Sequence, residues 1–251
     1  MSRNKSYGVF ADFYDELMQA DYGLIAERID EIVMREQGRR GILLDLACGT
    51  GTLCEKLAET GYDVIGVDIS EEMLSAALEK KYESGLPVQY LRQDMRHIDM
   101  FGTIDVIVCT LDSLNHLESV SDVKKTFEKV SLFSEPDGLF IFDVNTVYKH
   151  RNALGNNAFV YENDDVYCVW QNFLNDDDSV DIQLDFFETD EESGLYERST
   201  EEFSEICFSD DITVKMLEES GFEVLGIYDG YSGNPVKENS ERAVFVARKK
   251  G

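Results

Sequence analysis

Apolar residues in the first part of the chain fall into short continuous runs, separated by stretches with helical spacing. The runs cover residues 42–46, 63–67, 104–109 and 139–144. They lack the apolar–polar alternation of half-exposed strands, and such runs are typical of strands buried on both faces. The regular alternation of strand and helix predicts an α/β fold, in which helices cover both faces of a doubly wound, mostly parallel sheet.

The pattern changes after residue 146. Helical spacing disappears, and β-rich runs at 166–174 and 180–188 are separated by the polar stretch 175–179. Polar turns between β-rich runs predict antiparallel strands joined by hairpins. We therefore expect residues 147–207 to form an antiparallel β insertion after the fifth strand, which serves as a lid or substrate region.

Residues 208–251 return to the first pattern. A helix is expected over 209–220, followed by strands over 222–228 and 243–248. Together with residues 1–146, this tail is expected to complete one domain with a seven-stranded sheet.

A glycine-containing turn follows the first predicted strand. Residues 43–51 read Leu-Leu-Asp-Leu-Ala-Cys-Gly-Thr-Gly, and a helical pattern begins at Thr52. Gly49 and Gly51 lack a Cβ atom, so they can adopt unusual dihedral angles and leave room for a ligand at the carboxyl end of the strand. Asp68 ends the next strand, at a spacing that suits a carboxylate binding the ribose of a nucleotide cofactor.

The turn departs from the dinucleotide-binding pattern Gly-x-Gly-x-x-Gly, because Cys54 occupies the third glycine position. Leu-Asp-Leu-Ala-Cys-Gly-Thr-Gly instead resembles the first motif of the class I S-adenosylmethionine-dependent methyltransferases, most of all the small-molecule and amino-sugar N-methyltransferase group. The resemblance is strong over residues 41–146, moderate over 7–22 and 208–249, and architectural only across the insertion. The resemblance implies S-adenosylmethionine as the cofactor, with Asp68 at its ribose and Asp94 at the amino group of its adenine. Asp94 can equally cap a turn. The cofactor-binding residues implied by the resemblance are Tyr14, Asp45, Ala47, Gly49, Gly51, Asp68, Ile69, Met73, Asp94, Met95 and Leu111.

Two residues are candidates for catalysis. Residues 7–22 resemble the N-terminal lid of this class, in which a tyrosine folds over the cofactor; Tyr14 is the candidate here, although a tyrosine on a helix face can simply pack. His116 follows the fourth predicted strand in Ser-Leu-Asn-His-Leu, and related amino-sugar enzymes carry a histidine in a similar setting. An amine must be neutral to accept a methyl group, so His116 is expected to remove its proton. A lone histidine could instead cap the following helix.

The composition is strongly acidic. The chain carries 51 Asp and Glu against 23 Lys and Arg, a net charge of −28. This charge repels phosphate backbones and anionic bilayers, so neither nucleic acid nor a membrane is an expected partner. Residues 155–207 hold 16 Asp or Glu and one Arg, a net charge of −15. Acidity above a substrate site would favour a cationic or amine-bearing small molecule, but plain solubility would also explain it.

The chain shows no sign of export. The sequence has no run of roughly 18 apolar residues that could span a bilayer, and its N-terminus lacks the apolar core of a signal peptide. The five cysteines are scattered and never form Cys-x-x-Cys, which indicates reduced thiols rather than a disulfide framework or a zinc site. We expect a cytoplasmic protein without a metal ion, and the oligomeric state stays open.

Other functions also stay open. A metal-assisted O-methyltransferase could use Asp112, Asp143 and Asn145, although these residues form no tight carboxylate cluster in the sequence. A nicotinamide-dependent oxidoreductase is disfavoured by the missing third glycine. A regulatory protein could keep the cofactor site without catalysing a reaction, because a fold does not fix a function. The methyl acceptor, and the choice between nitrogen and oxygen, are not determined by the sequence.

Overall fold

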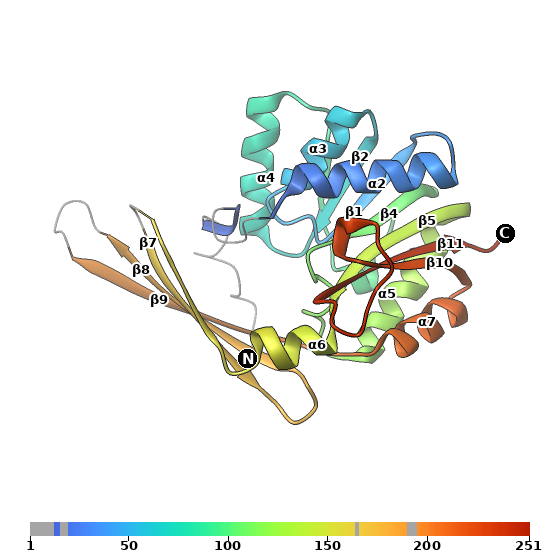
Figure 1. Cartoon of the computed structure of the whole chain (residues 1–251). Helices are drawn as coiled ribbons and strands as arrows, with labels where there is room; N and C mark the ends of the chain where they lie inside the picture. Colours follow the sequence, from blue (N-terminus) through green and yellow to red (C-terminus); the bar gives the residue numbers. More distant parts are fainter. Residues whose placement is uncertain (1–12, 16–19, 164–165, 190–194) are drawn as a thin grey trace.

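The computed structural model describes residues 13–15, 20–163, 166–189 and 195–251. Their strands form two separate sheets (Figure 1). The strands of the larger sheet are β1 (Ile42–Leu46), β2 (Asp63–Asp68), β3 (Gln89–Arg92), β4 (Ile104–Cys109), β5 (Ser134–Asn145), β10 (Phe222–Asp229) and β11 (Arg242–Lys249). The predicted fold class, a seven-stranded, doubly wound sheet with an antiparallel β insertion, is confirmed.

The order of strands in the larger sheet is β10–β11–β5–β4–β1–β2–β3. The five strands from β5 to β3 in this order are parallel, whereas β11 pairs antiparallel with β5 and β10 pairs antiparallel with β11. The chain adds β2 and β3 on one side of β1, and then β4 and β5 on the other side. The direction of winding therefore reverses between β1 and β4, and ligands of such sheets bind beyond the carboxyl ends of the strands at this reversal.

Helices cover both faces of this sheet. Their bounds are α2 (Tyr22–Glu36), α3 (Thr52–Thr60), α4 (Glu71–Ser84), α5 (Val120–Phe133) and α7 (Asp210–Glu219). Figure 1 shows α2, α3 and α4 on one side of the sheet, and α5 and α7 on the other. Successive side chains of a strand point to opposite faces, so Leu43 packs with residues of α2 and α3 while Leu44 packs with residues of α5 and α7. Both leucines are fully buried, which explains the unbroken apolar run of β1.

The second sheet consists of β6 (Ala158–Glu162), β7 (Val166–Leu174), β8 (Val180–Thr189) and β9 (Tyr196–Glu205), all paired antiparallel. One face of it is apolar, with Cys168, Leu184 and Phe186 completely buried. This face packs against Tyr14 and against Met73 of α4. The insertion is therefore joined to the larger sheet through the residues that flank the glycine-containing turn.

The expectation that helical structure is absent from residue 147 onward is wrong over residues 147–154. These residues form the short helix α6 (Val147–Lys149) and a turn of π-helix, η2 (His150–Leu154). The hydroxyl of Thr146 caps α6 by accepting the backbone N–H of Lys149 at 3.1 Å. Two turns are too short for helical spacing to show in the sequence.

Most of residues 7–22, the segment that resembles an N-terminal lid, fall outside the described residues; residues 13–15, which are described, are helical. In the described part of the chain, no helix has both the length and the apolar character needed to cross a bilayer.

Candidate active site

One cavity lies beyond the carboxyl ends of β1 and β4, where the winding of the sheet reverses. It spans about 1140 Å³ of space between atoms, part of it open to solvent. The residues singled out from the sequence that line it are Tyr14, Ala47, Gly49, Asp68, Ile69, Met73, Asp94, Met95, Leu111, Asp112 and His116. Folding thus brings together residues from the N-terminal segment, β1, β2, the end of β3 and the loop after β4.

The turn after β1 is fixed by the carboxylate of Asp68. Its Oδ2 accepts the backbone N–H of Gly49 at 2.9 Å, and its Oδ1 accepts that of Ser70 at 2.8 Å. Burial raises the pKa of Asp68, and these two N–H groups oppose the rise. A Cβ atom at Gly49 would meet nothing closer than 3.9 Å, so the turn leaves open space on the cavity side. Such a cradle fits the adenosine part of the implied cofactor.

Asp45 and Gly51 lie outside the cavity lining. Asp45 is buried beneath the turn, where its Oδ2 accepts from the thiol of Cys54 at 3.2 Å, and burial raises the pKa of Asp45 to about 7. Gly51 has a φ of +77°, and a Cβ atom there would lie 2.9 Å from the Cβ of Ala77 and would clash with Tyr90. The structure therefore gives both residues a role in the packing of the turn, and their contact with a cofactor stays a prediction.

Asp94 lines the cavity and also caps a turn. Its Oδ1 accepts the backbone N–H of Arg96 at 2.9 Å, and its Oδ2 pairs with the guanidinium of Arg96 at 2.6 Å. Burial favours the neutral acid, but Arg96 outweighs burial and holds the pKa of Asp94 below its usual value. The structure confirms that Asp94 caps this turn, and its contact with the adenine stays a prediction.

A strained turn follows β4. Leu111 and Asp112 have φ values of +54° and +53°, which residues other than glycine rarely adopt. The buried carboxylate of Asp143 holds them in place, because it accepts the N–H of Leu111 at 2.9 Å and that of Asp112 at 2.8 Å. Asp143 also accepts from the hydroxyl of Tyr231 at 2.5 Å and pairs with Arg242. The suggestion that Asp143 binds a metal ion is wrong, since its oxygen atoms are taken by these donors.

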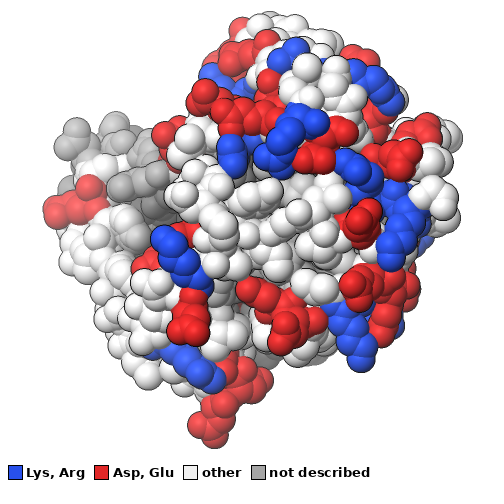
Figure 2. Space-filling model, turned by 45° about the vertical axis from the view of Figure 1, so that its right-hand side comes forward, with Lys and Arg blue, Asp and Glu red and all other residues white. Residues whose placement is uncertain are grey.

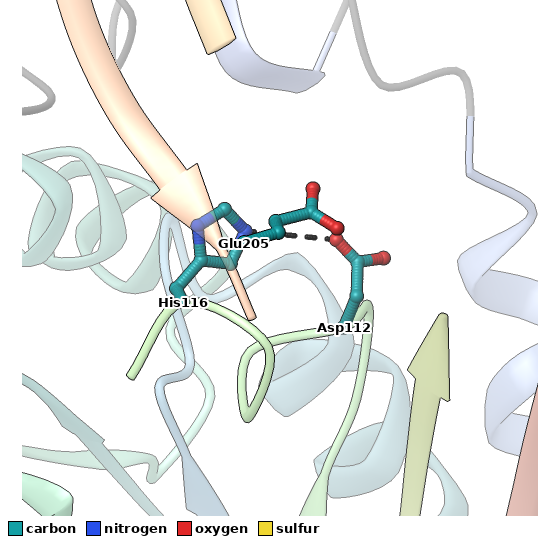
Figure 3. A group of neighbouring side chains, drawn as sticks. All are labelled: Asp112, His116 and Glu205. Atoms are coloured by element: carbon teal, nitrogen blue, oxygen red, sulfur yellow. Dashed lines mark ion pairs between the residues drawn. The ribbon is translucent and has the colours of Figure 1, made fainter. Parts of the chain in front are cut away.

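Past this turn, three side chains converge at one end of the cavity (Figure 3). Nε2 of His116 lies 3.6 Å from Oδ2 of Asp112, and Glu205 reaches the same point from the end of β9. One ligand atom of each residue lies within 4.8 Å of the other two. Arg242 pairs with the other oxygen of Asp112 at 2.5 Å. An imidazole with two carboxylates can bind a cation, either an ammonium group or a divalent metal ion.

The charges in this group shift its pKa values. Burial opposes ionisation of Asp112, but Arg242 and then His116 hold the pKa of Asp112 well below its usual range. Burial likewise acts to lower the pKa of His116, but the carboxylates of Asp112 and Glu205 outweigh it and raise the pKa above 6.5. His116 does not cap the next helix, since Ser119 fills that position in α5.

The N-terminal segment connects the turn to the insertion. The ring of Phe13 stacks on Phe186 of β8, with centroids 6.4 Å apart. The carboxylate of Asp15 accepts from the hydroxyl of Thr50 at 2.8 Å and pairs with Lys80 of α4. Tyr14, between these two anchors, lines the cavity.

Eight lining residues among the described ones were not singled out from the sequence: Gln93, Arg96, Ser113, Leu117, Glu118, Trp170, Phe203 and Glu205, of which the last three come from the insertion. Glu205 is 3% exposed, and Asp185 and Glu201 are also buried, whereas six of the eleven described acidic side chains of the insertion are exposed. The exposed ones among the described residues are Glu162, Asp176, Asp177, Asp181, Glu197 and Glu202. Among the described acidic residues of the insertion, Glu205 is the one that lines the cavity, and nothing in the acidic composition of the segment distinguishes it. Phe203 lies two positions before Glu205, so both side chains point to the same face of β9. An apolar residue at this spacing is the sequence feature that could have indicated an inward-facing pair.

Lys and Arg do not gather on the face shown in Figure 2. There they are interspersed among Asp and Glu. Many of the basic side chains are paired, for example Arg40 with Asp30 at 2.8 Å and Arg248 with Glu36 at 2.7 Å.

Comparison with known proteins agrees with this geometry. Residues 43–138 match the family described as a methyltransferase domain. The chain is 37% identical over 246 residues to the Bacillus subtilis (strain 168) protein YqeM, which its name calls a methyltransferase; the match covers 97% of each chain. A crystal structure of an S-adenosylmethionine-dependent methyltransferase from Clostridium acetobutylicum ATCC 824 superposes with a TM-score of 0.88 at 35% identity, covering 98% of this chain and 99% of that one.

A more distant structure shares the fold. It is the S-adenosylmethionine-bound amino pentose methyltransferase CalS10 from Micromonospora echinaspora, with a TM-score of 0.77 at 18% identity and complete coverage of both chains. The cradle formed by Gly49 and Asp68 fits S-adenosylmethionine as the cofactor. The chain belongs to the class I S-adenosylmethionine-dependent methyltransferases.

Proposed function

We propose that the protein methylates a nitrogen atom of a small amine. The observation that carries this proposal is the convergence of His116, Asp112 and Glu205 at the end of the cofactor cavity. An ammonium group has three N–H donors, and these three side chains offer three acceptor atoms within 4.8 Å of one another. The name of CalS10, an amino pentose methyltransferase, supports an amine acceptor on this fold.

The residues of the cluster have different roles in this proposal. Asp112 and Glu205 attract the ammonium form of the acceptor, and Nε2 of His116 takes a proton from it, which leaves a neutral amine and an imidazolium. S-adenosylmethionine supplies the methyl group from its sulfonium, so that an N–C bond forms as the C–S bond breaks and S-adenosylhomocysteine leaves. Arg242 keeps Asp112 ionised throughout. The aromatic rings of Tyr14, Trp170 and Phe203 exclude water and can contact a cation through their faces.

Amines without a neighbouring carboxylate are the expected acceptors. Arg96 is the one arginine among the described residues that line the cavity, and its guanidinium is already paired with Asp94. A carboxylate of the acceptor, close to its nitrogen, would instead be repelled by the carboxylates of Glu205 and Asp112. Formation of S-adenosylhomocysteine, measured with a panel of simple amines, matched alcohols and amino acids, tests this proposal. Turnover of alcohols with none of amines would contradict it.

The same three side chains make metal-assisted O-methylation the second candidate, because imidazole and carboxylates are ligands for Zn²⁺ or Mn²⁺. These ligands differ from the set suggested by the sequence, Asp112, Asp143 and Asn145. The oxygen atoms of Asp143 already accept hydrogen bonds, and Oδ1 of Asn145 accepts from Lys149 at 2.8 Å. In this case, methylation of hydroxyl acceptors would require an added divalent cation and would be abolished by EDTA. Amine methylation through His116 is expected to be unaffected by EDTA.

Cofactor affinity should depend on Asp68. We expect Asp68→Ala to weaken binding of S-adenosylmethionine by about 1.5–3 kcal/mol, the contribution of hydrogen bonds to a charged group. The variant also removes the acceptor of the N–H groups of Gly49 and Ser70. Calorimetry with S-adenosylmethionine and S-adenosylhomocysteine measures the loss, and Asp63→Ala, an exposed position at the start of the same strand, is the matched control. Tight binding of NAD, with no heat from S-adenosylmethionine, would refute the assignment of the cradle.

The rate should rise with pH. His116 accepts a proton only when it is neutral, and its pKa is raised above the ordinary value of 6.5. We therefore expect kcat/KM for an amine to be low at acid pH and to increase through a midpoint above 6.5. Asp112→Asn removes the largest contribution to the raised pKa, so its midpoint should be lower than that of the unaltered protein. A profile that does not change between pH 6 and 9 would show that His116 is not the base.

A further inference from the structure

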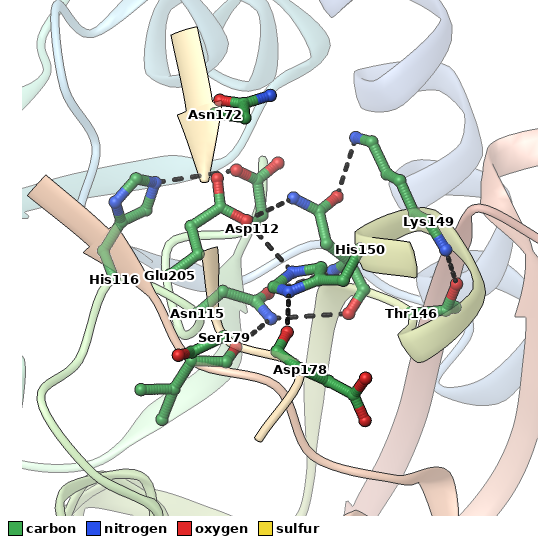
Figure 4. A network of polar contacts seen from close by, with 12 residues as sticks. Asp112, Asn115, His116, Thr146, Lys149, His150, Asn172, Asp178, Ser179 and Glu205 are labelled. Atoms are coloured by element: carbon green, nitrogen blue, oxygen red, sulfur yellow. Dashed lines mark hydrogen bonds and ion pairs between the residues drawn. The ribbon is translucent and has the colours of Figure 1, made fainter. Parts of the chain in front are cut away.

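A buried amide lies beside the three side chains that converge at the end of the cavity (Figure 4). It belongs to Asn115, which directly precedes His116 in the sequence Ser-Leu-Asn-His-Leu and is completely buried. The backbone N–H of Asn115 donates to the carbonyl oxygen of Asp112 at 2.8 Å. Asn115 is not one of the described residues that line the cavity, so its role depends on what its amide binds inside the protein.

The amide of Asn115 joins the two ends of the insertion. Its Oδ1 accepts the backbone N–H of Asn145, the last residue of β5, at 3.0 Å. Its Nδ2 donates to the carbonyl oxygen of Ile206, the first residue after β9, at 2.9 Å, and to that of Asn145 at 3.4 Å. The backbone N–H of Ile206 in turn donates to the carbonyl oxygen of Asn115 at 2.7 Å. One residue thus holds the segments through which the chain enters and leaves the second sheet.

The partners of this side chain require an amide. The backbone N–H of Asn145 can only donate, whereas the two carbonyl oxygens can only accept, so the position needs one acceptor atom and two donor hydrogens. An asparagine side chain offers that combination. An ionised carboxylate has no donor, and a hydroxyl has one. The partners also fix which end of the amide is the nitrogen.

These contacts set the spacing between His116 and Glu205. His116 directly follows Asn115 in the chain, and Glu205 directly precedes Ile206. The two hydrogen bonds between Asn115 and Ile206 therefore hold the backbones of both functional residues in a fixed register. The side chain of Glu205 is held as well, because its Oε2 accepts from Nδ2 of Asn145 at 2.8 Å.

We infer that Asn115 is a positioning residue that holds the loop after β4 against the end of β9, at the spacing where Asp112, His116 and Glu205 can meet one ligand. It acts through these three residues, without touching the ligand itself. Methyl transfer needs this precision, because a displacement of about 1 Å at the reacting groups can lower a rate about 10²-fold. The inference deepens the proposed function and rests on it for the chemistry of the ligand, an amine.

Hydrogen exchange in the full-length protein, with S-adenosylhomocysteine bound, tests the connection itself. In Asn115→Ala, the backbone N–H of Ile206 is expected to exchange about 10-fold faster, because the variant removes the amide hydrogen bonds that hold this segment. Asn115→Ser, which keeps one donor, takes its place if the alanine variant does not fold. An unaltered exchange rate of Ile206 would overturn the inference, whatever the protein methylates.

The matched control for general loss of stability is Ser134→Ala. Ser134 is buried at the start of β5, at the end of the sheet opposite the cavity, and its hydroxyl donates to the carbonyl oxygen of Val130 at 2.7 Å. This variant also removes a buried hydrogen bond, but it leaves the contacts of Asn115 intact. The exchange rate of Ile206 in Ser134→Ala therefore shows how much of the change comes from stability alone.

A double-mutant cycle with Glu205→Gln separates positioning from stability. The probe is propylammonium, titrated by NMR in the presence of S-adenosylhomocysteine. We expect Glu205→Gln and Asn115→Ala each to weaken its binding about 10-fold or more, the loss for one hydrogen bond to a charged group. The double variant should lose no more than the larger single loss, because Glu205 is already misplaced when the amide is absent. Affinity for S-adenosylhomocysteine should stay unchanged in all variants, which reports that they fold.

A role in stability alone predicts a different result. Propylammonium would then bind Asn115→Ala as well as it binds the unaltered protein, or the two losses would multiply in the double variant, as they do for independent sites. Either result would overturn the inference. If the unaltered protein does not bind propylammonium, the proposed amine acceptor fails instead, and hydrogen exchange at Ile206 decides the role of Asn115.

Discussion

Replacing His116 with alanine is expected to lower kcat for methyl transfer to an amine about 10²–10⁴-fold, the usual contribution of a general base. The ring lies half-buried in the cavity wall, with Asp112 3.6 Å from Nε2 and the ring of Phe203 at a centroid distance of 5.2 Å. Both neighbours fix its position at the end of the cavity opposite the cofactor turn. Binding of S-adenosylmethionine should therefore be nearly unchanged, since Asp68 and Gly49 are not disturbed.

The matched control is His97→Ala. His97 is exposed and lies outside the cavity lining, so its loss should leave kcat unaltered. Tyr14→Phe asks a separate question, because it keeps the ring in the lining and removes the hydroxyl. Rates are measured as S-adenosylhomocysteine release with an amine from the acceptor panel. Near-normal turnover of His116→Ala would reduce His116 to a positioning role.

Replacing Asp143 with alanine is expected to lower the free energy of unfolding by about 3–5 kcal/mol, the cost of removing one partner from a buried ion pair. The loss would leave Arg242 with Asp112 as its remaining partner and would leave the hydroxyl of Tyr231 without its acceptor. It would also release the left-handed turn at Leu111 and Asp112, whose N–H groups Asp143 accepts. Catalysis should fall as well, because Asp112 would no longer be fixed beside His116.

Urea unfolding followed by circular dichroism measures this effect. Glu219→Ala is the matched control, since Glu219 forms an ion pair with Lys124 in which both side chains are more than 40% exposed. An exposed pair contributes about 0–1 kcal/mol, so the two variants should differ clearly. A loss of less than 1 kcal/mol in Asp143→Ala would show that Arg242 and the turn are held by other contacts.

The sequence by itself determined the α/β architecture and the cofactor half of the site. Continuous apolar runs identify strands buried on both faces, as Leu43 and Leu44 in β1 illustrate, and the turn at Gly49 lies within a few residues of the strand that positions it. Asp68 and Asp94 could be placed for a similar reason, because each comes directly at the end of a parallel strand, and those ends meet at one edge of the sheet.

The tertiary structure alone decided which residues form the acceptor half. Glu205 lies far from His116 in the sequence and belongs to a segment rich in acidic residues, so its inward position depends on how the second sheet packs over the first. Asp143 resembled a metal ligand until its donors were known. The roles of Asp45 and Gly51 in the packing of the turn likewise depend on contacts that only the folded chain makes. Local patterns specify strands, turns and caps, because these depend on neighbouring residues, whereas long-range packing decides what each buried polar atom meets.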